Sequence, residues 1–460
     1  MLFNSFEFIF LFLPITFFIY FYLNKKKLIT ISKIFLVLSS LFFYSWWNIV
    51  YLPLILLSMM FNFTLGKLIL NNKENKILSK KIFLTIGIIT NISLLGYFKY
   101  ADFFIKNTNF FFDFQFAQLE LALPLAISFF TLQQIAYLVE TYRGKTKENN
   151  FLNYCVFVTF FPQLISGPIV YHKEIMGQFT SIKNKIINTN NISFGLLIFS
   201  IGFFKKVVIA DTFTIWATNG FNNPELLTFY KSWITSLSYT FQIYFDFSGY
   251  TDMAIGIALL FNIKLPINFN SPYKALNIQD FWRRWHITLS RFLKDYIYIP
   301  LGGNRQSSIK TYSNLMLTFI IGGLWHGASW TFLFWGFLHG MGLIVHRIWS
   351  VIGFKLNPFI SWIITFNFIN FTFIFFRAEE WNVATTILKK MFKFEIVEEI
   401  NLIELLLIAS TFLLVLLFKN SSQLKKIFSI YVGGFIGLLF FLSFIFLFLR
   451  GEGEFLYFQF

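Results

Sequence analysis

Long apolar runs are the feature of this 460-residue sequence that most limits what the chain can fold into. They recur along the chain with lengths close to the about 20 residues that a helix needs to cross a bilayer. In lipid, only helices and closed barrels satisfy all of their backbone hydrogen bonds, and runs of this length are typical of helices. With 56% hydrophobic and only 13% charged residues, the sequence predicts an all-α polytopic membrane protein.

The basic residues are unevenly placed. A formal net charge of +16 would suit a nucleic-acid-binding protein if these residues formed one patch. They gather instead in short loops between apolar runs, as in Lys25-Lys26-Lys27, which is the positive-inside bias of membrane proteins. The pattern predicts contact with membrane lipid, cytoplasmic basic loops and no nucleic-acid partner.

Counting the apolar runs predicts about twelve spans in a single membrane-embedded domain, residues 1–460. The run Phe6 to Leu23 precedes its lysines, so we expect a first span rather than a cleavable signal peptide. Residues 151–170 are broken by Pro162, Gly167 and Pro168 and are expected to be re-entrant. We expect a multi-pass protein of the inner membrane. Because the first basic loop is inside, an even number of spans places both termini outside the cytoplasm. Later spans are expected near residues 121–139, 192–217, 230–262, 313–331, 332–349, 357–376, 402–418 and 427–449.

Residues 263–313 form the longest stretch without a span, and we expect an amphipathic region on the cytoplasmic side. Within it, Asp280 to Asp295 is predicted to be one helix that ends before Pro300. Its charged stripe includes Arg283 and Arg284, and its opposite face carries Trp282 and Trp285. Such a helix lies in the membrane interface rather than across it.

Two roles stay open for this helix. His286 shares the face of Trp282, so it is expected to point into the protein, either as a hydrogen-bonded anchor or as a functional group. The basic stripe either binds anionic headgroups or docks a phosphorylated donor such as coenzyme A, because arginine suits bidentate phosphate contacts.

His326 lies within residues 311–346, which contain no Asp, Glu, Lys or Arg. A titratable ring in a membrane span is a candidate for proton transfer, with the bracing of neighbouring helices as the alternative. His339 and His346 share one face, about 200–220° around a straight helix from His326. A three-histidine metal site is therefore not expected, and a single cysteine, Cys155, excludes a cysteine cluster. We predict no metal and no tightly bound cofactor.

Two carboxylates, Asp246 and Asp252, lie in a further apolar run. Six residues apart, they point to different sides of a regular helix, although Ser248-Gly249 can bend it. They are candidates for a paired acid–base site or for substrate binding. The alternative is that each forms hydrogen bonds to a helix end or a basic group.

Several longer motifs resemble the membrane-bound O-acyltransferase family, in the bacterial branch of alginate and peptidoglycan O-acetylation. The similarity covers nearly the whole chain, and one departure is Ala126, where that branch more often has glycine. The motifs are Leu123-Pro-Leu-Ala-Ile-Ser-Phe-Phe-Thr131, Phe161-Pro-Gln-Leu-Ile-Ser-Gly-Pro168, Tyr244-Phe-Asp-Phe-Ser-Gly-Tyr-Thr-Asp252, Asp280-Phe-Trp-Arg-Arg-Trp-His286, Asp295-Tyr-Ile-Tyr-Ile-Pro-Leu-Gly-Gly-Asn-Arg305 and Gly323-Leu-Trp-His-Gly327.

The resemblance implies a helical funnel with re-entrant and interfacial helices, in which His326 is the essential catalytic residue and His286 the second histidine. It also implies a cytoplasmic acyl thioester, acetyl-CoA for an acetylating enzyme, and an acceptor on the other side of the membrane. Neutral His326 would take the proton of the attacking hydroxyl. Residues expected to bind donor or acceptor are Trp282, Arg283, Arg284, Trp285, Trp325, Asp246 and Asp252.

The C-terminal tail, residues 450–460, is expected on the extracytoplasmic side. Its aromatic end resembles a tail found in this branch and on small partner proteins of teichoic-acid D-alanylation. We hypothesise that Tyr457 accepts the acyl group and passes it to an extracytoplasmic O-acetyltransferase partner. The alternative is an aromatic belt that anchors the tail at the membrane surface.

The function expected from the resemblance is O-acetylation of a cell-envelope polysaccharide, peptidoglycan before alginate or another exopolysaccharide. D-alanyl transfer to teichoic acids would share the fold and His326 but would need an acyl carrier protein. A proton-coupled transporter that uses His326 as a relay is a different class, and it predicts paired repeats with broken helices. No such repeat is evident in the sequence.

Overall fold

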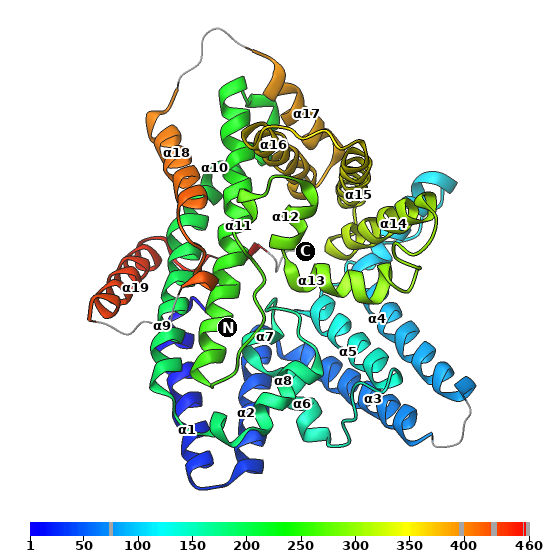
Figure 1. Ribbon diagram of the computed structural model, residues 1–460, viewed down its shortest axis with the longest axis vertical. Coiled ribbons are helices and arrows are strands. Elements are labelled where there is room, and N and C mark those ends of the chain that lie inside the picture. The colour runs from blue at the N-terminus through cyan, green and yellow to red at the C-terminus, as the bar shows by residue number, and fades with distance from the viewer. Residues whose placement is uncertain (73–76, 395–399, 425–429, 454, 457–460) are drawn as a thin grey trace. The chain divides into compact units, whose positions relative to one another are not determined.

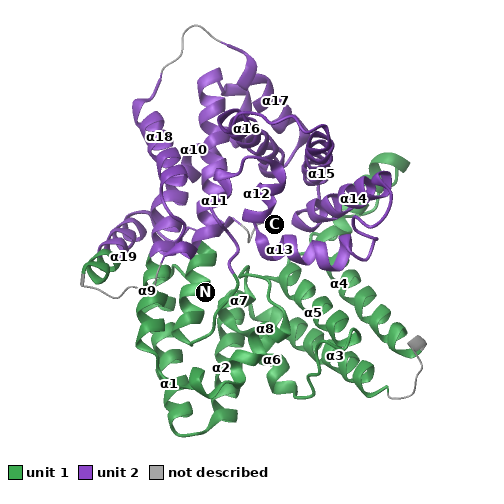
Figure 2. Cartoon of the chain, viewed as in Figure 1, with its two compact units in different colours: residues 1–200, 250–266, 426–437 green, residues 201–249, 267–425, 438–460 purple. Residues whose placement is uncertain are grey.

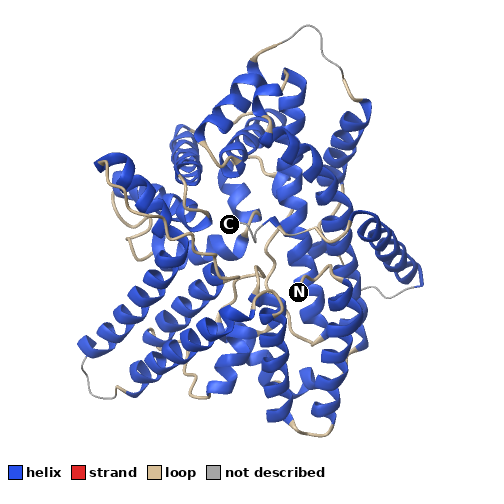
Figure 3. Ribbon diagram, turned by 180° about the vertical axis from the view of Figure 1, so that it is seen from behind, coloured by secondary structure: helices blue, strands red, loops and turns tan. Residues whose placement is uncertain are grey.

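A computed structural model describes residues 1–460 apart from 73–76, 395–399, 425–429, 454 and 457–460. The described residues form helices and connecting loops and contain no strand (Figure 1, Figure 3). This confirms the all-α prediction.

Seven helical segments among the described residues are long and apolar enough to cross a membrane. The shorter helix Ile29–Ser45 is also apolar, and the predicted number of about twelve spans stays a prediction. The seven segments are Phe8–Lys25, Ile49–Asn71, Ser79–Phe112, Thr189–Asn222, Pro358–Arg377, Leu402–Gln423 and Tyr431–Arg450.

The chain divides into two compact units (Figure 2). Unit 1 contains residues 1–200, 250–266 and 426–437, and unit 2 contains 201–249, 267–425 and 438–460. The expected single domain stays a prediction. Three helices contribute residues to both units: α9 (Thr189–Phe204), α11 (Phe229–Leu260) and α19 (Ile430–Arg450).

Unit 1 is a helical bundle with an aromatic core. In it α1 packs on α2, α5 packs on both α3 and α4, and α6 packs on α2. The core includes Phe3, Phe8, Phe43 and Phe161, whose rings are fully or almost fully buried against one another. Its helices are α1 (Leu13–Lys25), α2 (Ile29–Ser45), α3 (Leu52–Asn71), α4 (Ile77–Phe112), α5 (Ile127–Tyr142), α6 (Phe151–Thr159), α7 (Phe161–Leu164) and α8 (His172–Thr180).

The segment expected to be re-entrant consists of α6 and α7, which are too short to cross a bilayer. Phe160 separates them with a non-helical backbone, at φ −47° and ψ 107°, and Pro162 lies in the first turn of α7. The predicted break therefore occurs where proline cannot continue a helix.

Unit 2 contains a hairpin in which α14 (Ser308–His326) packs closely on α15 (Trp330–Ile352) (Figure 1). Helices α12 and α16 pack on α15, and α17 packs on α16. The remaining helices of the unit are α10 (Asp211–Asn222), α12 (Ile278–Arg284), α13 (Ile287–Leu293), α16 (Pro358–Arg377), α17 (Trp381–Phe392) and α18 (Leu402–Leu417).

The predicted single helix from Asp280 to Asp295 is wrong in one respect. The chain breaks at Trp285 and His286 into α12 and α13, because Trp285 is extended and His286 has a positive φ of 41°. The charged stripe was predicted for one continuous helix, so it describes the side-chain directions only within α12 and within α13 separately. His286 still points inward, as expected, with 0% of its surface exposed.

Candidate functional site

Two glycines bring the helices of the α14–α15 hairpin into backbone contact. A β-carbon at Gly323 would clash with the carbonyl oxygen of Phe332, and one at Gly336 would clash with that of Phe319. Only glycine permits such an approach. This close packing fixes the end of α14, where His326 is the last helical residue.

The His326 side chain is buried, with 4% of its surface exposed, and lies among aromatic rings. Its ring centroid is 4.9 Å from that of Trp325, 5.0 Å from Phe376 and 5.3 Å from Trp335. Trp335 comes from α15 and Phe376 from α16, so three helices of unit 2 build this wall. The neutral imidazole is the form of such a ring that can accept a proton.

His286 is held at the break between α12 and α13 by Asn268. The Asn268 side-chain oxygen accepts hydrogen bonds from the Thr288 backbone N–H at 3.1 Å, the Thr288 hydroxyl at 2.9 Å and His286 Nδ1 at 3.2 Å. The Asn268 carbonyl also accepts from Ile287 N–H. These bonds offset the left-handed conformation, which costs about 1–3 kcal/mol for a residue other than glycine. With Nδ1 donating, Nε2 of the neutral ring is an acceptor.

The structure brings the two histidines together. The ring centroids of His286 and His326 are 6.3 Å apart, and Trp325 lies 6.3 Å from His286. Burial lowers the pKa of His286 well below its usual value, because desolvation penalises the charged ring. At neutral pH the site therefore contains an uncharged His286 oriented by an amide.

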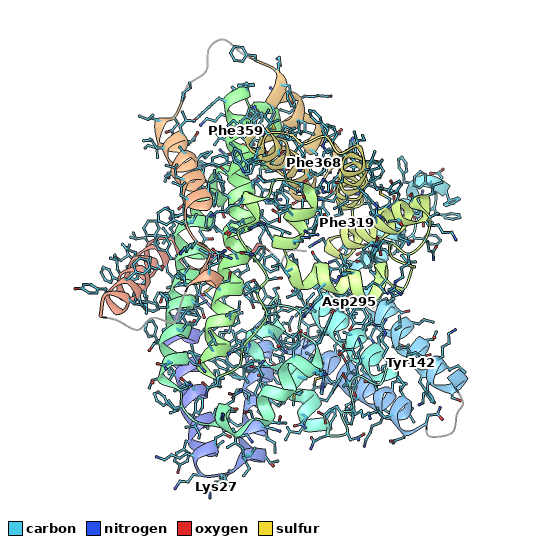
Figure 4. All side chains as sticks on the ribbon, in the orientation of Figure 1. Lys27, Tyr142, Asp295, Phe319, Phe359 and Phe368 are labelled. Carbon is cyan, nitrogen blue, oxygen red and sulfur yellow. The ribbon has the colours of Figure 1, made fainter. Side chains whose placement is uncertain are left out.

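His339 ties together three helices beside this site. Trp282 Nε1 of α12 donates to His339 Nδ1 at 3.1 Å, so His339 Nε2 carries the proton and donates to Thr372 Oγ1 of α16 at 3.1 Å. The ring also contacts Phe319 and Phe368, both labelled in Figure 4. This arrangement suits a structural tie.

The expectation that His339 lies on the far side of a straight helix from His326 is wrong. The helix stops after His326 and α15 begins at Trp330, so the chain folds back on itself. Trp335 contacts both rings, at 5.3 Å from His326 and 4.5 Å from His339.

Trp285 and the two arginines of α12 differ in their surroundings. Trp285 is buried against Phe281, with their ring centroids 5.5 Å apart. Arg284 Nε is 2.9 Å from Asp280 Oδ2 within α12, and its Nη1 donates to the Asn270 carbonyl, so Arg284 links the end of α12 to the preceding loop. Arg283 is exposed.

A cavity of about 560 Å³ opens beside α12, lined also by α14, α15 and the loop before α14. Its lining includes Lys294, Arg305, Arg347 and His346, and no acidic residue. Within the described residues, no carboxylate pairs with any of its Lys or Arg side chains. Gln279 also lines it, and Arg283 lies one turn further along α12. This cavity is suited to an anionic ligand.

Asp246 belongs to a separate cluster in unit 2. Its Oδ1 lies 2.7 Å from Lys206 Nζ, and the same nitrogen lies 2.8 Å from Asp211 Oδ1. Pairing with a basic group is the alternative that the sequence left open for Asp246. Asp252 is buried on the same helix but falls in unit 1. Tyr457 lies outside the described residues.

The described residues contain no group of three or more His, Cys, Asp or Glu side chains placed to hold a metal ion. What the site offers is a proton acceptor, His326, next to an oriented neutral histidine and a buried aromatic wall. Such a group can take a proton from a hydroxyl as that hydroxyl attacks a carbonyl carbon.

Sequence reasoning missed Asn268, Trp335 and the role of Lys206. A lysine within a predicted span is itself a signal of function, because charge in a membrane is costly. Asn268 gave no such signal in the sequence, since it acts by accepting hydrogen bonds at the break at His286, which was not predicted.

Comparison with known proteins places these features in a wider context. A model of the membrane-bound O-acyltransferase family matches residues 1–379. The chain is 54% identical over 421 residues to the peptidoglycan O-acetyltransferase of Helicobacter pylori, covering 85% of this chain and 80% of that protein. It is 40% identical over 403 residues to a probable alginate O-acetylase of Pseudomonas aeruginosa, covering 86% and 75%. It is 28% identical over 293 residues to the teichoic acid D-alanyltransferase of Streptococcus thermophilus, covering 55% and 68%.

Proposed function

Because this chain belongs to the membrane-bound O-acyltransferase family, and so is an acyltransferase, we propose that it transfers acetyl groups to a polysaccharide of the cell envelope, namely peptidoglycan. The choice of peptidoglycan rests on the higher identity to the relative of that name than to the alginate relative. The proximity of His286 and His326 is the observation that carries the chemistry.

In the proposed reaction, the acceptor hydroxyl oxygen attacks the carbonyl carbon of an acetyl thioester and gives its proton to His326. The carbon–sulfur bond then breaks, and His326 returns the proton to the departing thiolate. His286, fixed by Asn268, orients donor or acceptor through its ring. The aromatic wall excludes water and so suppresses hydrolysis of the thioester.

The proposed donor is acetyl-CoA on the cytoplasmic side. The cavity lined by Lys294, Arg305 and Arg347 supports this choice, because its volume and unpaired positive charge suit the phosphate groups of a nucleotide thioester. Arg283 is placed to add a further contact. Arg284 already pairs with Asp280, so its proposed role is to hold α12 in position.

The proposed route across the membrane uses the C-terminal tail. The Tyr457 hydroxyl attacks the thioester carbonyl, the thiolate leaves, and a tyrosyl acetate ester forms. A hydroxyl of an extracytoplasmic O-acetyltransferase partner, or of the polymer, then attacks this ester and releases the phenol. A phenol with a pKa of about 10 is a better leaving group than an alkyl alcohol, so the ester stays activated.

The test is the amount of ester-linked acetate on purified peptidoglycan from the parent strain and from a strain with His326→Ala. We expect the variant to lose nearly all of the enzyme-dependent acetate. The matched control is His172→Gln, a buried histidine of unit 1 that the proposed mechanism does not use.

Equal acetate in parent and His326→Ala strains contradicts the peptidoglycan assignment. Acetate lost from an exopolysaccharide instead, or ester-linked D-alanine lost from teichoic acid, would identify the other acceptors. In the same strain background, Tyr457→Phe removes the tail hydroxyl, and unchanged transfer to the polymer would exclude the tyrosyl relay.

A further inference from the structure

Lys206 is a buried charge that the proposed chemistry does not use. It has 2% of its surface exposed and lies in a helical segment apolar enough to cross a membrane. It falls in a wider π-type turn, Lys205–Ala210, between α9 and α10. Such turns are rare and often mark functional positions, and a buried charge is costly unless it is paired.

Close helix packing brings the partners of Lys206 to it. A β-carbon at Gly249 of α11 would lie 2.7 Å from the Gly202 carbonyl oxygen, so this glycine lets α11 approach the turn. Asp246, one turn before Gly249, then reaches Lys206, which also pairs with Asp211. The ion cluster of Lys206, Asp211 and Asp246 has one positive and two negative charges. A stable buried cluster therefore needs further donors.

The C-terminal tail supplies one such donor and two further contacts. The backbone N–H of Leu456 donates to Asp246 Oδ2 at 3.1 Å, and the Phe455 ring lies 4.9 Å from Lys206 Nζ. Gly453 passes over Asp211 so closely that a β-carbon there would meet Oδ2 at 3.0 Å. Phe455 and Leu456 are both buried, at 1% and 7% exposed.

A second contact holds the start of the tail. Arg450, the last residue of α19, donates from Nη1 to the Thr212 hydroxyl at 2.9 Å, one residue after Asp211. The tail is thus attached to unit 2 at both ends of its described part, by a side chain at Arg450 and by the backbone at Leu456.

We propose that the ion cluster is a docking site for the C-terminal tail, and that Lys206 and Asp246 are positioning residues that hold the tail for acyl transfer. The positioning role rests on the proposed transfer through the tail, whereas the docking does not. The site recognises a backbone N–H and an aromatic ring, so its occupant is a chain segment rather than a free anion or cation.

The test removes the backbone donor without touching the cluster. Leu456→Pro lacks the N–H that Asp246 accepts, and Leu456→Met keeps both the N–H and the side-chain volume. Purified proteins in detergent are treated with glutamyl endopeptidase, which cuts after the exposed Glu452, and intact mass measures the cleavage rate. We expect Leu456→Pro to be cleaved roughly tenfold faster, because a hydrogen bond to a charged group is lost, and Leu456→Met to be protected like the parent.

Acetyl transfer to the polymer and binding of acetyl-CoA are measured on the same proteins. We expect Leu456→Pro to lose transfer to the polymer while keeping the affinity of the parent for acetyl-CoA, a split that general unfolding does not produce. Asp246→Asn combined with Lys206→Met should give the same split from the other side of the contact.

An unchanged cleavage rate overturns the docking site. Faster cleavage with unchanged acetyl transfer overturns the positioning role. If the parent protein itself transfers no acetyl group, the proposed function fails, and faster cleavage of Leu456→Pro still supports the docking site.

Discussion

At the residue scale, the site depends on His286, whose conformation and burial both cost folding free energy. His286 takes a left-handed backbone conformation and is fully buried, and both features oppose folding. Asn268 offsets them with a single side-chain oxygen that accepts from three donors, one on His286 and two on Thr288. Because the break lies at His286 itself, the ring departs from the line of either short helix and comes to within 6.3 Å of His326.

The depressed pKa of His286 predicts a pH dependence of stability. The folded pKa lies below the unfolded value of about 6.5, so the unfolded chain binds the extra proton first. The contribution of neutral His286 to the free energy of unfolding is therefore complete above pH 6.5. Below pH 6.5 it falls by about 1.4 kcal/mol for each pH unit, until the folded pKa is reached.

The measurement is the thermal unfolding of parent and His286→Asn between pH 7.5 and 5 in detergent. Asparagine tolerates the left-handed conformation but does not titrate, so its stability should fall less steeply on acidification. Parallel curves for the two proteins would show that His286 is already charged or solvated in the folded state.

At the element scale, the α14–α15 hairpin and the short helix α12 have different roles in the site. The hairpin fixes His326 through backbone contact at Gly323 and Gly336. Helix α12 carries Trp282, which His339 ties to α16. The basic cavity lies where these same elements meet the loop before α14. Donor binding and proton transfer are thus served by adjoining surfaces of one unit.

Gly323→Ala should damage the enzyme through this hairpin. The new β-carbon meets the backbone of Phe332, which cannot rotate away, so we expect a loss of about 1–3 kcal/mol in stability. His326, three residues later, would shift, and a displacement near 1 Å lowers turnover by about 100-fold. Thermal unfolding and acetyl transfer measure both effects.

The matched control is Gly96→Ala in α4, where nothing lies within 4 Å of the added carbon. It should leave both measurements close to those of the parent. A fully active Gly323→Ala enzyme would contradict the requirement for backbone contact.

The basic cavity predicts a defect in donor binding. Replacing Lys294, Arg305 and Arg347 together by glutamine should raise the KM for acetyl-CoA by roughly tenfold for each lost phosphate contact, with kcat largely kept. Steady-state kinetics across donor concentrations separate the two constants. Lys310→Gln, an exposed lysine of α14 outside the cavity, is the control. A lower kcat at unchanged KM would place the cavity outside the donor site.

At the scale of the whole molecule, the sequence predicted the helical class, the broken segment at 151–170 and the family, because each depends on local patterns. The two histidines of the site also came from motifs. Their approach, and the fold-back that puts Trp335 beside both His326 and His339, depended on breaks at His286 and after His326. The break at His286 lies in a segment with good helical periodicity, so tertiary contacts decided it. The turn after His326 lies close to the span boundary expected between residues 331 and 332. The partners of Lys206 come from three parts of the chain, which no local pattern connects.

Membrane topology gives a further prediction for the whole chain. With Cys155→Ala as background, Lys26→Cys should react with a membrane-impermeant maleimide only after the cells are permeabilised, because basic loops stay in the cytoplasm. Phe114→Cys, exposed in the loop after α4, should react in intact spheroplasts, because this loop is poor in lysine and is therefore expected outside the cytoplasm. Equal labelling of both positions in intact spheroplasts would contradict the predicted orientation.

The glycine contact in the hairpin also bears on how such an enzyme could diverge. The position of His326 is set by contact between the backbones of α14 and α15. A change of side-chain rotamer cannot relieve a clash in such a contact. Substitutions in the hairpin glycines would therefore tend to abolish activity rather than redirect it. The side chains of Trp325, Trp335 and Phe376 contact His326 through their rings rather than through the main chain. We expect the choice between acetyl and bulkier acyl groups to evolve through those three rings, while the hairpin beneath them stays constant.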